Sequence, residues 1–109
     1  MEKNDGIASI IGKVYNLPDD SMMKFVNLVE EHVYPKGHIL YKQNEKASKI
    51  YIVRQGLVRA YACRGTKLIT FWFGRDGELA FPIKSVFNGS EEYASIDLLE
   101  TSVIYEIKI

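Results

Sequence analysis

From His38 onward the sequence is a series of short runs that favour β-strands, and this pattern limits the fold more than any other feature. The runs are rich in Ile, Val, Tyr, Phe and Trp, and polar or glycine-containing turns separate them. They read HILYK, KIYIV, LVRAYA, LITFWF, SIDLL and VIYEIKI. Strands at this spacing predict an antiparallel sandwich or barrel. The clearest hairpin is LVRAYACRGTKLITFWF, with Arg64-Gly65-Thr66 at its tip.

The first third of the chain has a helical pattern instead. Pro18 and the acids after it supply a start signal, and the Tyr34-Pro35-Lys36-Gly37 segment supplies a stop. Between them, apolar residues recur at the spacing of one helix face, namely Met22, Phe25, Val26, Val29 and Val33. We therefore expect a helical segment at residues 1–34 and a β-roll at residues 35–109, within one domain.

Composition excludes several classes of protein. The chain has 109 residues, and its 14 Lys+Arg balance its 14 Asp+Glu, which argues against a domain whose main task is to hold nucleic acid. A single cysteine, Cys63, excludes an internal disulfide framework and a multi-cysteine metal site. Its thiol is expected to be buried or on an edge strand. No apolar run is long enough to span a bilayer or to act as a secretory signal, so we expect a cytoplasmic protein without a membrane partner.

The β-type section also carries an ordered series of turns and strand starts. In chain order they are Lys36-Gly37, Ile39 to Tyr41, Asn44-Glu45, Tyr51-Ile52-Val53 leading into Gly56, Leu57-Val58, the hairpin at Gly65, and Gly77-Glu78. This series resembles the cyclic-nucleotide-binding jelly roll of the Crp/Fnr family of bacterial transcription regulators. The resemblance runs from about residue 20 to residue 109. It implies a mainly β fold with N-terminal helices, an antiparallel double-stranded β-helix of cupin-like shape.

The resemblance also implies where a ligand would bind. In cyclic-nucleotide-binding members a Gly-Glu pair approaches the phosphate and ribose, and a later Arg-Ser/Thr-Ala segment pairs with the phosphate. By spacing from Gly77, these positions fall on Phe81-Pro82 and on Glu92-Tyr93-Ala94, so only the alanine is kept. Proline offers neither a carboxylate nor an amide donor, and Glu92 places a negative charge where a cation should meet phosphate. We expect no cyclic AMP or cyclic GMP binding of the usual kind, unless a shifted register brings Lys84 into the pocket.

Two interpretations of this altered region remain open. Its interior is filled by aromatic side chains as ordinary core, or the pocket is recut for a different small effector. The candidate pocket residues are Phe71, Phe73, Gly77, Glu78, Leu79, Ala80, Phe81, Pro82, Glu92, Tyr93 and Ala94.

Enzymatic alternatives have little support. A cupin-type metal enzyme needs several converging histidines, whereas this chain has His32 and His38 and no His-x-His motif. His32 is interpreted as a favourable contact at the end of the predicted helix. The adjacent acids Glu30-Glu31 and Glu91-Glu92, and the scattered arginines, are interpreted as solvent-facing charges. We predict no catalytic residue, no cofactor and no metal site.

The resemblance implies partners that this sequence does not itself contain. Crp/Fnr regulators continue into a dimerising helix and a DNA-binding helix-turn-helix, whereas this sequence ends at Ile109 in the last predicted strand. We expect the effector-sensing domain of such a regulator, which would reach DNA only through an additional C-terminal domain and could self-associate as a homodimer. The alternative is a stand-alone jelly-roll module that binds a small molecule or a protein without metal. The identity of any effector stays open.

Overall fold

The described part of the chain forms two four-stranded antiparallel sheets. The structure is a computed structural model that describes residues 27–108. The first sheet has the order β1 (Glu30–Tyr34), β8 (Ser102–Lys108), β3 (Lys49–Gln55) and β6 (Leu79–Ala80). The second has the order β2 (Ile39–Tyr41), β7 (Ser95–Leu98), β4 (Val58–Arg64) and β5 (Lys67–Gly74). A short helix, α3 (Ile83–Asn88), lies between β6 and β7 in the chain.

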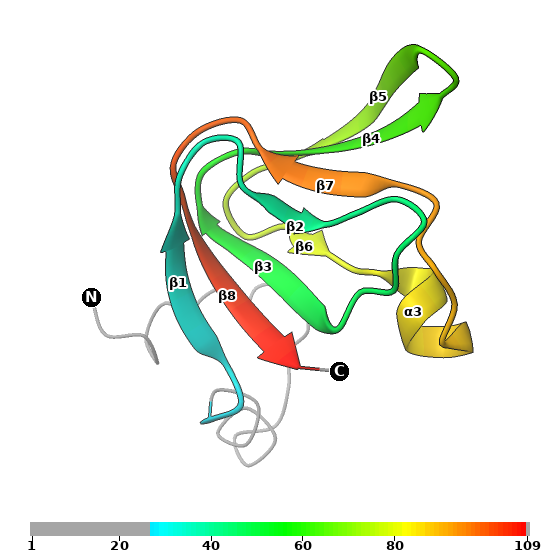
Figure 1. The fold of residues 1–109 in the computed structure, drawn as a ribbon. Coiled ribbons are helices and arrows are strands. Elements are labelled where there is room, and N and C mark those ends of the chain that lie inside the picture. The colour runs from blue at the N-terminus through cyan, green and yellow to red at the C-terminus, as the bar shows by residue number, and fades with distance from the viewer. Residues whose placement is uncertain (1–26, 109) are drawn as a thin grey trace.

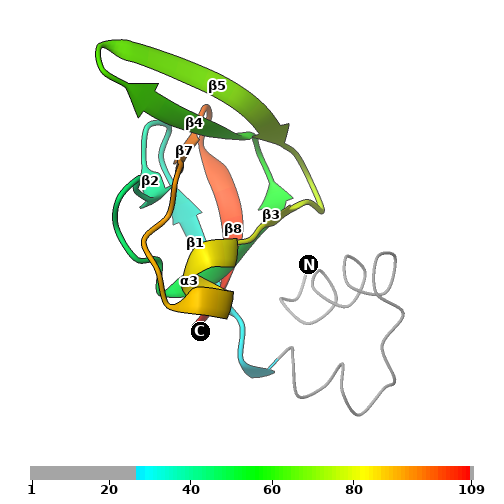
Figure 2. The ribbon, with the colours of Figure 1, turned by 90° about the vertical axis from the view of Figure 1, so that its right-hand side faces the viewer.

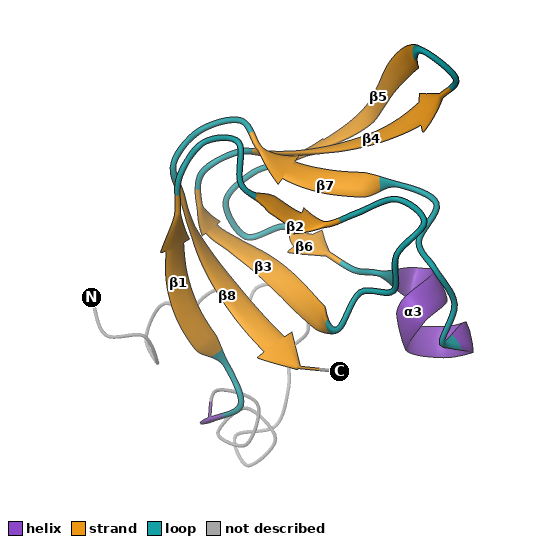
Figure 3. Ribbon diagram, viewed as in Figure 1, coloured by secondary structure: helices purple, strands orange, loops and turns teal. Residues whose placement is uncertain are grey.

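Each predicted β-type run contains a strand of the structure, and the predicted jelly roll is confirmed. Strands make up most of the described chain (Figure 3). Arg64 pairs with Lys67 across the β4–β5 ladder, so Gly65 and Thr66 form the turn of this hairpin. Gly65 has φ 62°, a left-handed conformation that glycine adopts without steric strain. The hairpin extends beyond the body of the roll at the end opposite α3 (Figures 1 and 2).

The predicted helix is wrong at its C-terminal end, where the structure has a strand. Residues 30–34 form β1, which pairs antiparallel with β8 from Glu30↔Glu106 to Tyr34↔Ser102. Val33, expected on the buried face of a helix, is 66% exposed, whereas Val29 just before the strand is 1% exposed. Backbone hydrogen bonds to β8 outweigh the helical periodicity of these residues, because alternate residues of β1 pair with the neighbouring strand. The rest of the predicted helix and its start signal lie outside the described residues, apart from Asn27 to Val29.

One hydrophobic core lies between the two sheets and takes side chains from both. Its fully buried members include Val53 on β3, Val58 on β4 and Ile104 on β8. Tyr51 also lies in this core, and its hydroxyl donates to the Leu40 carbonyl oxygen at 2.9 Å. The polar end of this aromatic side chain is thus satisfied inside the core.

A tight turn before β6 positions the start of the candidate ligand region. Gly77 has φ 87°, and its amide donates to the Val53 carbonyl oxygen at 2.6 Å. The Val53 amide in turn donates to the Glu78 carbonyl oxygen at 2.9 Å, so residues 77–80 lie against β3. None of the described helices is long and apolar enough to cross a membrane.

Candidate ligand pocket

A cavity of about 400 Å³ lies between β5, β6 and the segment leading into β7. Its walls are mostly apolar and aromatic. The lining residues are Tyr41, Ala60, Phe71, Trp72, Leu79, Ala80, Phe81, Ile83, Glu92, Tyr93, Ala94 and Ile96. The volume lies within the range of small-molecule sites, about 300 to 1,000 Å³. The described side chains therefore leave this region hollow.

A β-bulge brings Phe71 to the pocket. Ala60 pairs with Trp72 and the next residue, Tyr61, pairs with Thr70, so Phe71 has no partner on β4. An extra residue of this kind bends the strand and changes the direction of its side chain. Phe71 and its neighbour Trp72 consequently both line the cavity, although successive side chains of a regular strand point to opposite faces.

Two aromatic side chains stand at the mouth of the pocket. The rings of Phe71 and Tyr93 are nearly parallel, with centroids 6.2 Å apart and an interplanar angle of 19°. Phe71 is 51% exposed and Tyr93 is 57% exposed, so solvent reaches this end of the cavity.

Glu92 is the charged residue of the lining, and the structure holds it firmly. The backbone is fixed by hydrogen bonds with the 44–45 segment: Asn44 N–H donates to Glu92 O at 2.7 Å, and Glu92 N–H donates to Glu45 O at 2.9 Å. Both the amide and the hydroxyl of Ser85 donate to Glu92 Oε2 at 2.7 Å. Pro82, at the start of α3, makes no side-chain capping hydrogen bond, and Glu92 accepts from a first-turn amide in its place.

The expectation that Glu92 faces solvent is therefore wrong: only 4% of it is exposed, whereas its neighbour Glu91 is exposed. Its charge acts on a second lining residue, Tyr41. Burial, together with the negative charge of Glu92, raises the pKa of the Tyr41 hydroxyl well above its ordinary value. This wall of the pocket consequently presents a neutral phenol and a carboxylate.

The structure brings together most of the predicted pocket residues. Those in the lining are Phe71, Leu79, Ala80, Phe81, Glu92, Tyr93 and Ala94. The others lie elsewhere: Phe73 is 55% exposed outside the cavity, Gly77 and Glu78 form the turn before β6, and the Pro82 side chain is fully buried. Lys84, which a shifted register would place in the pocket, is not part of the lining.

Sequence reasoning missed five lining residues, namely Tyr41, Ala60, Trp72, Ile83 and Ile96. Four of them lie on β2, β4, β5 and β7, and Ile83 opens α3. The strand runs containing four of them were recognised, but only the tertiary arrangement shows that their side chains meet. A weak signal for Ile96 was its place two residues after the predicted Ala94, since alternate residues of an extended segment share a face, although Ala94 itself precedes β7.

Arg59 corrects the prediction that the arginines all face solvent. It pairs with Asp97 directly across the β4–β7 ladder, with Nε to Oδ1 at 3.0 Å and Nη2 to Oδ2 at 2.7 Å. This two-pronged contact raises the pKa of the Arg59 guanidinium further, chiefly through the hydrogen bond to Asp97. Cys63, on the same strand, is exposed rather than buried, and it lies beyond the residues of β4 that pair with β7, so among the described strands only β5 pairs with it.

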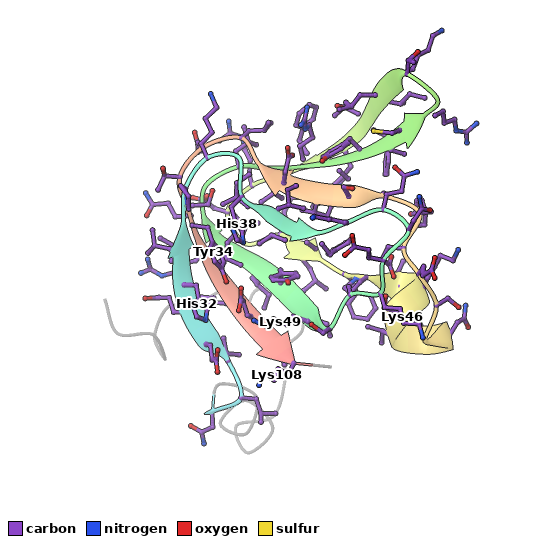
Figure 4. The ribbon with its side chains drawn as sticks, viewed as in Figure 1. His32, Tyr34, His38, Lys46, Lys49 and Lys108 are labelled. Carbon is purple, nitrogen blue, oxygen red and sulfur yellow. The ribbon has the colours of Figure 1, made fainter. Side chains whose placement is uncertain are left out.

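His32 is likewise not at a helix end. It lies on β1, with Nε2 at 3.2 Å from Glu30 Oε2 and at 3.4 Å from Glu106 Oε2. Its ring stacks on Tyr34, which stacks on His38 with centroids 4.0 Å apart (Figure 4).

The atoms of Glu30, His32 and Glu106 lie within 4.8 Å of one another, a spacing compatible with a metal ion. The buried Glu106 carboxylate, however, already accepts from two protein groups. Lys49 Nζ lies 2.8 Å from its Oε2, and the Tyr34 hydroxyl donates to its Oε1. A metal ion would have to displace the Lys49 ammonium, so the geometry favours an internal ion pair.

Comparison with known proteins gives a consistent result. The sequence profile of the cyclic nucleotide-binding domain matches residues 31–109. The fold is similar to the regulatory domain of Toxoplasma gondii PKA solved with cAMP, with TM-score 0.88 and 12% identity over 97% of this chain and 41% of that one. A comparison with curated proteins gave no match.

Two further structures extend the range of similar proteins. Thermus thermophilus catabolite activator protein has TM-score 0.77 and 21% identity, covering 91% of this chain and 45% of that chain. A regulatory subunit of a cAMP-independent protein kinase A from Trypanosoma cruzi, bound to guanosine, has TM-score 0.84 and 10% identity, covering 97% and 39%. The chain thus spans less than half the length of these proteins.

The two-sheet roll and the pocket between β5, β6 and β7 define a sensor domain of the cyclic-nucleotide type. With its profile matching from residue 31 to the last residue, the chain belongs to the cyclic nucleotide-binding domain family.

Proposed function

We propose that this chain is the effector-sensing domain of a Crp/Fnr-like transcription regulator, and that its pocket binds a small effector other than a cyclic nucleotide. The domain acts by binding rather than by catalysis, in the cytoplasm. Effector binding in the roll would shift a two-state equilibrium that is coupled to dimerisation and to DNA binding elsewhere in the full protein.

The observation that carries the ligand part of this proposal is the position of Glu92. Its carboxylate lies on the pocket wall, 4% exposed, at the position where the family resemblance places the phosphate-binding arginine. At a separation of about 4 Å and an effective dielectric constant of about 20, two negative charges repel by about 4 kcal/mol. An arginine at the same distance would attract the phosphate by a similar amount. A cyclic phosphate would therefore lose an attraction and meet a repulsion.

The backbone at the start of α3 gives a second reason. Pro82 has no amide hydrogen, and the Ser85 amide already donates to Glu92. Position 82 thus has no amide donor for a phosphate, and the amide donor at position 85 is already used by Glu92. A roll of this shape also accommodates ligands without phosphate, since the similar Trypanosoma cruzi protein was solved with guanosine.

The regulator part of the proposal is supported by the ordered series of turns from Lys36-Gly37 to Gly77-Glu78 and by the likeness to a bacterial catabolite activator protein. The gene tests it directly. An in-frame downstream region that encodes a helix-turn-helix is expected, and a stop codon immediately after Ile109 would contradict a regulator and favour a stand-alone binding module.

Calorimetry tests the ligand part. Titration of the 109-residue chain with cyclic AMP should give no binding at sub-millimolar concentrations. A thermal-shift screen of a metabolite library should in parallel yield at least one stabilising compound. Micromolar affinity for cyclic AMP would overturn the assignment of Glu92 to the phosphate position.

A further inference from the structure

We propose that the pocket binds an organic cation, in which an amine or quaternary ammonium group is attached to an apolar or aromatic body. This inference rests on the proposed function, because it names the ligand class of the same pocket. It depends on the charge of Glu92, on the chemistry of the surrounding walls and on the open mouth.

Glu92 differs from the other strongly buried carboxylates of the described chain. Asp97 is 9% exposed and pairs with Arg59 at 2.7 Å, and Glu106 is 3% exposed and pairs with Lys49 at 2.8 Å. Glu92 is buried to the same extent, yet no cation within residues 27–108 lies at ion-pair distance from it. Buried carboxylates are rare unless they are paired. One negative charge on the pocket wall therefore has no counter-ion among the described residues.

Glu92 lines the cavity, and its described side-chain hydrogen bonds engage only one of its two carboxylate oxygens. Both of its described side-chain hydrogen bonds come from Ser85 and end on Oε2, and both donors are neutral. No described residue donates to the second oxygen, Oε1. The described residues that line the pocket include no lysine, arginine or histidine. Within residues 27–108, no side chain of the lining brings a positive charge to this carboxylate, so a cationic ligand would supply one.

Ligand entry makes the charge of the ligand decisive. A molecule that fills the cavity removes water from the carboxylate, and a desolvated, unpaired charge is strongly unfavourable. An apolar ligand leaves that penalty in place, and an anionic ligand adds repulsion to it. A cation replaces the lost water with an ion pair, which is favourable in a site of low dielectric constant.

The walls favour the same class of ligand. Tyr41, Phe71, Trp72, Phe81 and Tyr93 surround the cavity together with aliphatic side chains. The faces of aromatic rings carry partial negative charge and attract ammonium groups, most strongly when water is excluded. The raised pKa of Tyr41 keeps its hydroxyl neutral across the physiological range, so it adds a π face and a phenol to the site. At the mouth, the near-parallel rings of Phe71 and Tyr93 offer surfaces on which a planar ligand body can stack.

Three probes that share one phenyl body and differ in charge test the inference on the unmodified 109-residue chain. They are phenethylamine, a cation at neutral pH, phenethyl alcohol, which is neutral, and hydrocinnamate, an anion. Dissociation constants are measured by calorimetry or by NMR titration. Phenethylamine is expected to bind at least about tenfold more tightly than the neutral probe, and the anion more weakly than either.

Variants then locate the preference. Glu92→Gln removes the charge and keeps an oxygen that can accept from Ser85, so the cation's advantage should fall to within about twofold of the neutral probe. Glu91→Gln is the matched control, since it makes the same change on the exposed neighbour and should leave all three constants unchanged. Phe71→Ser, at a half-exposed position, should weaken the cation and the neutral probe alike.

The outcomes separate this inference from the proposed function. If the three probes bind equally and Phe71→Ser weakens them all, the pocket is a ligand site but the cation preference is wrong. If no probe binds at millimolar concentration and the metabolite screen is also empty, both are overturned. Because the comparison of the three probes uses the unmodified chain, the inference remains testable even if Glu92→Gln fails to fold.

Discussion

Gly56 shows how strongly one residue position can be constrained in this roll. It lies between β3 and β4, where the chain passes from one sheet to the other, and has φ 140°. A Cβ at this position would overlap the Ser102 side chain and come within 2.9 Å of Ser102 Cα on β8. The Gly56 amide also donates to Asp76 Oδ1 at 2.9 Å, which ties the crossing to the turn before β6.

Gly56→Ala is therefore expected to destabilise the fold by about 2–4 kcal/mol, because the backbone conformation is strained for alanine and the crossing must move away from β8. Urea denaturation measures the change in the free energy of unfolding. Gly65→Ala is the control, since Gly65 also has positive φ but has no atoms within 4 Å of a built Cβ. It should lose only about 1 kcal/mol. Equal losses in the two variants would contradict this account.

Among the elements, α3 and the loop after it depend on one hydroxyl group. Ser85 Oγ accepts from the Ala47 amide at 2.9 Å and donates its one hydrogen to Glu92 Oε2 at 2.7 Å, and the Ser90 carbonyl oxygen lies 3.0 Å from the same hydroxyl oxygen. These contacts join the β2–β3 connection, the end of α3 and the pocket wall. The helix is only six residues long, so its placement depends on such tertiary contacts more than on its own helical propensity.

Ser85→Ala should lower the free energy of unfolding by about 2–3 kcal/mol, since buried partners lose their hydrogen bonds. The Ala47 amide should exchange with solvent faster, which hydrogen-exchange NMR would detect. Ser90→Ala serves as the control, because Ser90 takes part in the described hydrogen bonds through its backbone and not through its hydroxyl. Unchanged Ala47 exchange in Ser85→Ala would show that this hydroxyl does not tie the elements together.

At the scale of the whole molecule, buried tyrosines couple the fold to alkaline pH. Burial, with a smaller contribution from Glu106, raises the pKa of Tyr51 to about 12. Burial also raises the pKa of Tyr34, Tyr41 and Tyr105. The unfolded chain loses its phenolic protons near pH 10, whereas the folded chain keeps them to higher pH. The stabilisation is thus fully present below about pH 10 and is lost as the pH rises towards the folded-state values.

The free energy of unfolding should accordingly be flat in pH near neutrality and fall above about pH 10, by up to about 1.4 kcal/mol per pH unit for each such tyrosine. Urea denaturation at increasing pH measures this slope. Tyr51→Phe should be less stable near neutral pH, since the Leu40 carbonyl oxygen loses its donor, but should show a shallower alkaline slope. An unchanged slope in this variant would contradict the role of Tyr51.

The sequence by itself determined strands β2 to β5, β7 and β8, the hairpin and the sharp turns. These features depend on local chemistry: β-branched and aromatic residues favour extended backbone, and glycine permits the positive φ found at Gly65 and Gly77. The ordered turns resemble those of a known jelly-roll family, and this resemblance predicted the fold. Glu92, Tyr93 and Ala94, which spacing from Gly77 assigned to that family's ligand segment, line the cavity.

Only the tertiary structure decided what those residues do. The 30–34 segment has a helical pattern but forms β1, because β8 offers it a partner strand. Phe71 reaches the pocket through a bulge that composition does not reveal. Glu92 resembles a surface acid in sequence, yet it is buried because the Ser85 amide and hydroxyl lie within hydrogen-bond distance of its carboxylate. Whether a charge is buried and paired depends on neighbours that the fold brings together in space. The order of residues along the chain does not show which neighbours these are.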